Sequence, residues 1–137
     1  KGTYNEIMIV DDYAHHPTEI NALLDSVRLM YPNKRVIGVF QPHLFTRTRD
    51  FFDGFAQALS RLDEVVLLPI YPARELPIEG VTSDALLEKI EAESKAVMSP
   101  ADAVEHVSKS DYDVVLTIGA GDIDRIVLPL KNQLENG

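Results

Sequence analysis

The sequence predicts an α/β fold: a three-layer, doubly wound and mostly parallel sheet of about five to six strands, of the Rossmann-like kind. Two observations predict it. Short apolar runs alternate along the chain with segments whose apolar residues recur at helical spacing. Several of these runs, such as Val65–Leu68, are apolar at every position, which is typical of strands that helices cover on both faces.

Five apolar runs are predicted as strands. They are Ile7–Val10, Arg35–Phe40, Glu64–Leu68, Lys95–Met98 and Asp113–Ile118. Strands that alternate with helices are joined by right-handed crossovers, so we expect these five to lie in one sheet.

Four further segments have the spacing of amphipathic helices. Pro17 fits a first helical position, and Ser99 followed by Pro100 predicts a capped helix start. Pro129 removes a helical N–H, so we expect a kink or an early end in the last helix. The apolar positions expected on helical faces are Ile20, Leu23, Leu24, Val27 and Met30; Phe52, Phe55, Leu59 and Leu62; Leu86, Leu87 and Ile90; and Ile123, Ile126, Val127 and Leu130.

Length and charge narrow the possible functions. The 137 residues suffice for a single domain, 1–137, with its own core. A formal net charge of −9 argues against nucleic acid as a partner and gives little attraction to an anionic membrane. The absence of cysteine excludes disulfides and thiolate metal sites and fits a cytoplasmic protein. Because the chain begins at Lys1 and not at a methionine, we expect a piece of a longer protein, with a processed N-terminus as the alternative.

Ligands of such sheets bind beyond the carboxyl ends of the strands, which directs attention to four loops. The first, residues 11–16, holds the adjacent carboxylates Asp11 and Asp12. A ribose diol, a metal or an arginine would relieve their repulsion; alternatively, one carboxylate caps the next helix and the other is solvated. His15 and His16 are sequence neighbours that point apart, so we expect no metal site there.

The second loop, residues 41–48, is cationic in an otherwise acidic chain. Arginine offers a planar fork to a carboxylate or a phosphate. We expect Arg47, near the loop mouth, to bind an anion, and Arg49 to pair with Asp50 or Asp53 along the following helix. The third loop, 69–82, is either a rim, a contact with another domain or plain surface, and the glycines of the fourth, 119–122, are a weak signal alone.

Four segments together resemble the C-terminal domain of the Mur ligases, from about residue 7 to the end. They are VDDYAHHPTE at 10–19, FQPH at 40–43, TRTRD at 46–50 and GAGDI at 119–123. The second and third favour the members that join L-alanine to UDP-N-acetylmuramate. The first is shared with the ligase that recycles murein tripeptide, which stays the alternative.

The resemblance implies part of a three-domain, ATP-dependent ligase of peptidoglycan synthesis. In that family ATP phosphorylates the carboxylate of UDP-N-acetylmuramate, and the amine of L-alanine then displaces phosphate. The central domain would hold most of the ATP and the Mg²⁺, and this chain indeed lacks a Gly-x-x-x-x-Gly-Lys-Ser/Thr motif. The C-terminal domain would close over the reactants beside the central and N-terminal domains, and would be inactive alone.

The resemblance also implies roles for single residues. Asp12 and His15 would lie on the nucleotide side, with Asp12 near the ribose. His43 and Arg47 would serve catalysis and the incoming amino acid, with Arg47 forked onto the alanine carboxylate, and Tyr13 would border the methyl pocket. One position departs from the pattern: many members carry arginine directly after the histidine, where this chain has Leu44.

Two readings from other classes compete. The run Ile7–Asp12 looks like the acidic start of a receiver domain of a signalling protein. A receiver needs an aspartate after its third strand and a lysine after its fifth, where this chain has Leu68-Pro69 and Ile118-Gly119. The second rival is a stand-alone nucleotide-binding or interaction module of similar fold, since fold does not determine function.

Overall fold

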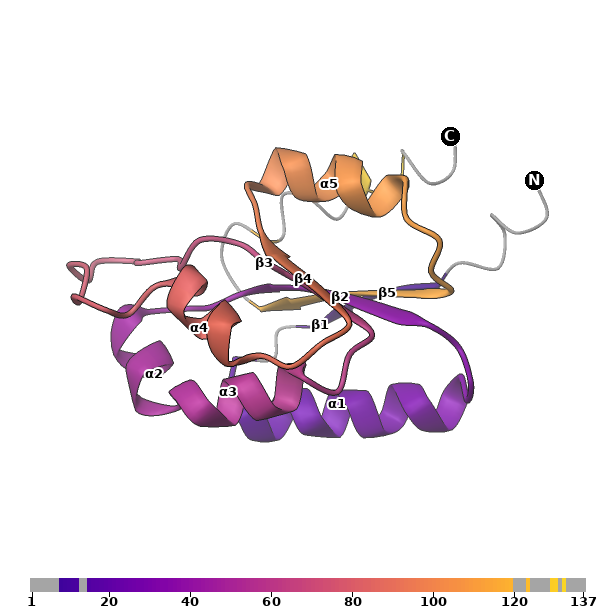
Figure 1. The fold of residues 1–137 in the computed structure, drawn as a ribbon, viewed down its shortest axis with the longest axis horizontal. Helices are drawn as coiled ribbons and strands as arrows, with labels where there is room; N and C mark the ends of the chain where they lie inside the picture. Colours follow the sequence, from indigo (N-terminus) through magenta and orange to yellow (C-terminus); the bar gives the residue numbers. More distant parts are fainter. Residues whose placement is uncertain (1–7, 13–14, 120–122, 124–128, 131, 133–137) are drawn as a thin grey trace.

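The computed structural model describes residues 8–12, 15–119, 123, 129–130 and 132. Within them, five parallel strands form one sheet in the order β1-β5-β2-β3-β4 (Figure 1). The strands are β1 (Met8–Asp12), β2 (Val36–Gln41), β3 (Glu64–Leu67), β4 (Ser94–Val97) and β5 (Val114–Gly119). The predicted parallel α/β fold is confirmed, and each predicted strand agrees with an observed one to within two residues at either end.

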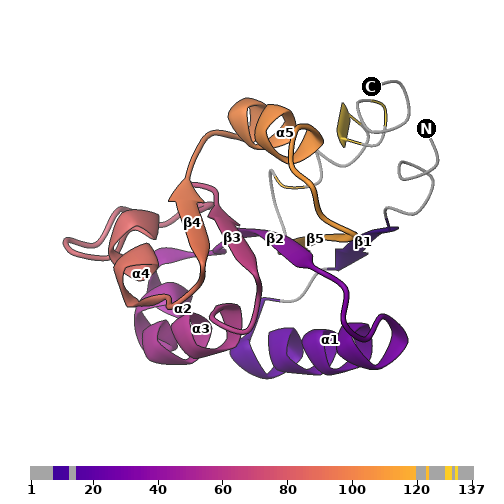
Figure 2. The ribbon, with the colours of Figure 1, turned by 45° about the vertical axis from the view of Figure 1, so that its right-hand side comes forward.

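Helices cover both faces of this sheet (Figure 2). Helices α1 (Pro17–Met30), α3 (Phe52–Leu59) and α4 (Ser83–Lys89) pack on one face, and α5 (Pro100–Ser108) packs on the other. The short α2 (Phe45–Asp50) follows the end of β2 and contacts α3. The three layers explain the continuous apolar runs, because alternate strand residues enter different cores. In β2, for example, Phe40 joins the core under α1 and α3, whereas Val39 joins the core under α5.

The helix starts agree with their sequence signals. Pro17 is the first residue of α1, and Pro100 is the first of α5, where the Ser99 hydroxyl accepts a hydrogen bond from Asp102 N at 3.2 Å. The expectation that Met30 lies on the buried face of α1 is wrong, because its side chain is 60% exposed. The residue that follows Val27 on the buried face is Tyr31, four positions later, and it packs against the core in the place expected for Met30.

Three loop boundaries also differ from the prediction. Asp11 and Asp12 are the last residues of β1, because Thr117 and Ile118 of β5 offer them a paired strand. Residues 45–50 form α2 and not a loop. Leu62 lies past the end of α3 yet is 3% exposed, and it fills the space above Gly38, where a Cβ would lie 2.5 Å from Leu62 Cδ1.

Part of the predicted last helix lies outside the described residues, as do Ile7, Tyr13, Ile126 and Val127. Ile123 and Leu130 are fully buried in the core under α5. Pro129 is helical, but the kink expected there involves neighbours that the structure does not describe. Among the helices within the described ranges, none combines the length and the apolar character that a membrane span requires.

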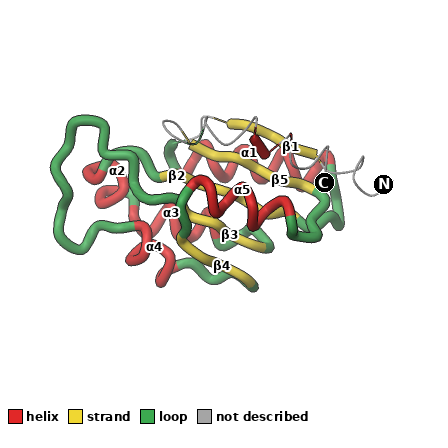
Figure 3. Tube along the Cα trace, turned by 90° about the horizontal axis from the view of Figure 1, so that it is seen from above, coloured by secondary structure: helices red, strands yellow, loops and turns green. Residues whose placement is uncertain are grey.

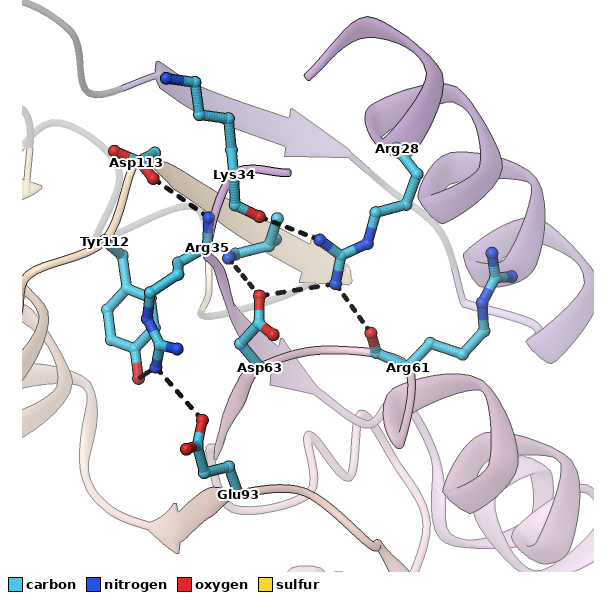
Figure 4. Close-up of polar contacts among 9 residues, drawn as sticks. Arg28, Lys34, Arg35, Arg61, Asp63, Glu93, Tyr112 and Asp113 are labelled. Carbon is cyan, nitrogen blue, oxygen red and sulfur yellow. Dashed lines mark hydrogen bonds and ion pairs between the residues drawn. The ribbon is translucent and has the colours of Figure 1, made fainter. Parts of the chain in front are cut away.

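Polar contacts tie together the segments at the amino ends of the strands (Figure 4). Arg28 donates to the carbonyl oxygens of Lys34 and Arg61, each at 3.0 Å, and Asp63 accepts from Val36 N at 2.7 Å. These groups bond backbone atoms of the turns that lead into β2 and β3. This edge of the sheet is therefore occupied by structural contacts, and ligand chemistry is to be sought at the opposite, carboxyl edge.

Candidate functional site

The carboxyl ends of β1, β5 and β2 lie side by side. Asp12, the last residue of β1, pairs with Ile118 of β5, and Ile118 pairs on its other side with Phe40 of β2. Two strand spacings thus separate the backbones of Asp12 and Phe40, roughly 10 Å. The loops after β1 and β2 therefore emerge at one edge, as the proposed site requires. The side chain of Asp12 is outside the described part of the structure.

His43 and Arg47 form a pair just beyond β2. Arg47 lies one helical turn after His43, and its Nη1 is 3.2 Å from His43 Nδ1. Because a guanidinium has donors only, Nδ1 must accept, which places the ring proton of neutral His43 on Nε2. Burial, the positive charge of Arg47 and that of His15 lower the pKa of His43, while Glu75 opposes them. His43 is thus held neutral, beside a permanently charged guanidinium.

Tyr71, from the loop after β3, contacts the face of the His43 ring. Its ring stacks on the imidazole, with centroids 5.5 Å apart and planes 13° from parallel. Two backbone hydrogen bonds of 2.8 Å join the segments: Leu44 N donates to Tyr71 O, and Tyr71 N donates to Pro42 O. The third loop is therefore attached to the His43 segment, and the reading of it as plain surface is wrong for this part of the loop.

Gln41 connects three of the loops. Its amide nitrogen donates to Pro69 O at 3.1 Å, and its amide oxygen accepts from Ile123 N at 2.9 Å. The side chain is 3% exposed. Gly119 ends β5 beside it with a φ of 126°, and a Cβ there would lie 2.7 Å from Gln41 O. The strand end thus needs glycine because no side chain fits and because its backbone is left-handed.

Sequence reasoning did not assign a role to Gln41. The available signal was a glutamine directly after five buried strand positions, since a buried amide needs both donor and acceptor partners. The loops that supply those partners were not identifiable from spacing.

The histidines of the first loop have different surroundings. His15 N donates to Glu19 Oε1 at 2.9 Å, and its ring lies near enough for its charge to affect His43. His16 caps α1, with Nδ1 accepting from Thr18 N at 3.1 Å, and its ring lies 4.4 Å from that of Phe51. His16 is therefore the N-cap residue of α1, and the side chains of Asp11 and Asp12 lie outside the described residues. Within the described ranges, no group of three His, Asp or Glu residues is arranged to hold a metal ion.

Arg47 and Arg49 differ in their partners, and the predicted pairing of Arg49 with Asp50 is confirmed. Arg49 Nε lies 2.9 Å from Asp50 Oδ1, in an exposed ion pair of little energetic value. Arg47 makes no ion pair with a carboxylate of the described residues, so its charge is available to a ligand.

A comparison with known protein families places the chain in one of them. Residues 1–121 match the family model described as "Mur ligase, glutamate ligase domain". The chain belongs to the Mur ligase family. Among its relatives, the UDP-N-acetylmuramate–L-alanine ligase of Cytophaga hutchinsonii is 56% identical over 126 residues, which are 92% of this chain and 27% of the relative. The same-named protein of Porphyromonas gingivalis is 52% identical over 130 residues, 94% of this chain and 28% of the relative.

This Mur ligase domain therefore spans little more than a quarter of the length of these relatives. A murein peptide ligase from Psychrobacter arcticus has the same fold, with a TM-score of 0.76 and 24% identity over 97% of this chain and 28% of the other. Folylpolyglutamate synthase of Mycobacterium tuberculosis resembles the domain more distantly, with a TM-score of 0.56 and 18% identity over 91% of this chain and 29% of the other. At such identities the likeness is one of fold.

Family membership and topology exclude the receiver reading. Receiver domains have the strand order 2-1-3-4-5, which puts the first strand inside the sheet, whereas β1 of this Mur ligase domain is at the edge of the sheet that the described residues form. Leu68, where a receiver needs its aspartate, is fully buried in the core.

Proposed function

We propose that the domain is the C-terminal part of a cytoplasmic, ATP-dependent ligase that joins L-alanine to UDP-N-acetylmuramate in peptidoglycan synthesis. The observation that carries the proposal is the 56% identity to an alanine-adding ligase over 92% of the chain. The pairing of Arg47 with a neutral His43 at the carboxyl edge supports it. The likeness to the murein peptide ligase, at 24% identity, does not favour the recycling reaction.

In this reaction ATP activates the carboxylate of UDP-N-acetylmuramate as an acyl phosphate, and the alanine amine displaces phosphate through a tetrahedral intermediate. The task of the C-terminal domain is to hold a small zwitterion in line with that centre. Arg47 has the fork geometry for the alanine carboxylate, and Tyr13 borders the methyl group. Tyr71 stacks on the imidazole of His43, and Nδ1 of that ring accepts a hydrogen bond from the Arg47 guanidinium. These two contacts orient the guanidinium before the substrate arrives.

A neutral His43 suits this task. It adds no charge that would repel the incoming ammonium group, and its Nε2–H is the ring's donor for an anionic oxygen of the reaction centre. Asp12 and His15, from the neighbouring loop, belong to the nucleotide side, with Asp12 near the ribose. Mg²⁺ would neutralise phosphate charge when bound, and the resemblance to the Mur ligases makes the central domain of the full-length protein its expected holder.

Steady-state kinetics of the full-length enzyme test the proposal. Phosphate release should require ATP, UDP-N-acetylmuramate and L-alanine together, and murein tripeptide should not replace L-alanine. Arg47→Ala should raise the KM for L-alanine on the order of 10- to 100-fold and change the KM for ATP by less than about threefold, because a charge-assisted bidentate contact to one substrate is removed. Arg49→Ala removes an equal charge two residues away and is the control.

Two results would contradict the proposal. One is a wild-type enzyme that uses the tripeptide and ignores L-alanine. The other is an Arg47→Ala variant that loses ATP and L-alanine affinity equally. The domain 1–137 alone should form no product.

A further inference from the structure

The loop after β3 brings one more cation to the edge where His43 and Arg47 lie. The loop projects past the carboxyl ends of the strands and runs alongside α2 (Figure 3). Within it, residues 72–75 form a tight turn closed by a 2.8 Å hydrogen bond from Glu75 N to Pro72 O. Arg74 occupies one of the two corner positions of this turn.

Both ends of the turn are attached to the segment that carries the pair. On one side, Tyr71 shares two backbone hydrogen bonds with Pro42 and Leu44. On the other, the Glu75 carboxylate accepts from Thr46 N at 3.0 Å and from the Thr46 hydroxyl at 2.5 Å. Thr46 directly precedes Arg47 in the chain. Arg74 therefore lies between two attached residues, Tyr71 three positions before it and Glu75 directly after it. Both bind to the segment 42–46.

The side chain of Arg74 is exposed to solvent. It makes no hydrogen bond or ion pair with any part of the chain that the structure describes. Its neighbour Glu75 is engaged by Thr46, and those hydrogen bonds lower the pKa of the Glu75 carboxyl. Ala73 before it adopts a left-handed φ of 53°, a conformation that a non-glycine residue keeps only when its surroundings impose it.

A carboxylate bound beside His43 and Arg47 could accept hydrogen bonds from a second cationic side chain. One arm of Arg47, Nη1, is directed at His43 Nδ1, so Arg47 cannot give all its donors to a carboxylate. Leu44, next to His43, brings no charge. A substrate carboxylate has two oxygens with about four acceptor positions, and the net charge of −9 makes uncompensated anion binding unfavourable.

We infer that Arg74 is a second binding residue for the carboxylate of the incoming amino acid, which it contacts jointly with Arg47. The inference rests on the proposed function and extends it to the third loop. In this arrangement Glu75 is a positioning residue: its bonds to Thr46 fix the turn, and the turn presents Arg74. The cation that Leu44 does not provide then comes from a loop about 30 residues further along the chain.

The test compares Arg74→Ala, Arg74→Lys and Arg49→Ala in the full-length enzyme. Arg74→Ala should raise the KM for L-alanine about tenfold and leave the KM values for ATP and UDP-N-acetylmuramate within about twofold. Arg74→Lys keeps the charge but not the fork and should lie between wild type and Arg74→Ala. Arg49→Ala, with the same loss of charge, should behave as wild type.

A second substrate separates binding from a merely structural effect. L-alaninamide keeps the amine and the methyl group but has no carboxylate. Its kcat/KM, taken from the slope of rate against concentration, should be the same in wild type and Arg74→Ala. A structural defect would lower it in the variant as much as it lowers kcat/KM for L-alanine.

Three outcomes would overturn the inference: an L-alanine KM of Arg74→Ala equal to that of Arg49→Ala, an equal loss with L-alaninamide, or an increase confined to the KM for ATP. Each can occur while Arg47→Ala still raises the L-alanine KM, in which case the proposed function stands without Arg74. A wild-type enzyme that does not use L-alanine would instead refute the proposed function, and the inference with it.

Discussion

Arg47 donates from Nη1 to Nδ1 of His43 across 3.2 Å, and this contact places a permanent positive charge against a partly buried imidazole. The two groups act on each other: burial and then the charge of Arg47 lower the pKa of His43, and His43 Nδ1 accepts a hydrogen bond that orients the guanidinium. Each can therefore be tested through the other.

Removing Arg47 should raise the pKa of His43. Burial is the largest cause of the lowered pKa and stays in Arg47→Ala, so the value should rise but remain below that of an exposed histidine. An NMR titration of the full-length enzyme carrying ¹³C-labelled histidine would measure it, with Arg49→Ala as the control. A fall, or no change, in Arg47→Ala would contradict the assigned contact.

The same shift predicts a pH dependence of folding. Since the pKa of His43 is lower in the folded chain, the unfolded chain takes up this proton at higher pH. The contribution of His43 to stability should thus be full above the ordinary histidine pKa and be lost as pH falls from there through the lowered value. Urea unfolding of domain 1–137 at a series of pH values would test this. The free energy of unfolding should fall less with decreasing pH in His43→Asn than in wild type, and identical pH profiles of the two proteins would contradict the lowered pKa.

Glu75→Ala should weaken L-alanine binding although Glu75 does not contact the substrate. With no partner at Thr46, the turn that carries Arg74 and the start of α2 lose their common anchor, so we expect the KM for L-alanine to rise about three- to tenfold. Glu75→Gln keeps one acceptor and should be milder. Glu79→Ala removes the same charge from an exposed position of the same loop and should have no effect on KM.

Gln41→Met should destabilise the domain by roughly 2 to 4 kcal/mol. The substitution conserves volume but leaves Pro69 O and Ile123 N without their buried partner, and each unsatisfied group costs about 1 to 3 kcal/mol. Urea unfolding would measure the free energy, with the exposed Gln57→Met as the matched control. If the two variants are equally stable, the amide does not hold the loops together.

Two glycine substitutions separate backbone strain from steric overlap. Gly80 has a φ of 82°, and no heavy atom lies within 4 Å of the position that a Cβ would take there, so Gly80→Ala should cost about 1 kcal/mol from strain alone. Gly119→Ala adds an overlap with Gln41 O to a similarly left-handed backbone and should cost several times more, or prevent folding. Similar unfolding midpoints for the two variants would show that the backbone at the end of β5 shifts to accommodate the added Cβ.

Much of the candidate site follows from local pattern. The alternation of strand and helix places the loops after β1 and β2 at a carboxyl edge, and the cationic second loop indicates an anion site. The pairing of Arg49 with Asp50 is predictable from their adjacency along the helix. The roles of Asp12, Tyr13, His15, His43 and Arg47 stay predictions, and the side chains of the first two lie outside the described residues.

The helices, the strands and the edge of the sheet where ligands are expected can be predicted from the sequence, because periodicity and capping act over a few residues. Which loops meet at that edge is visible only in the folded chain. The fold puts β5 between β1 and β2, brings Glu75 onto Thr46 across 29 residues, and sets Ile123 against Gln41 across 82. Such contacts depend on strand order and chain closure, which no local pattern encodes, and they bring the loop of Arg74 to the segment of Arg47.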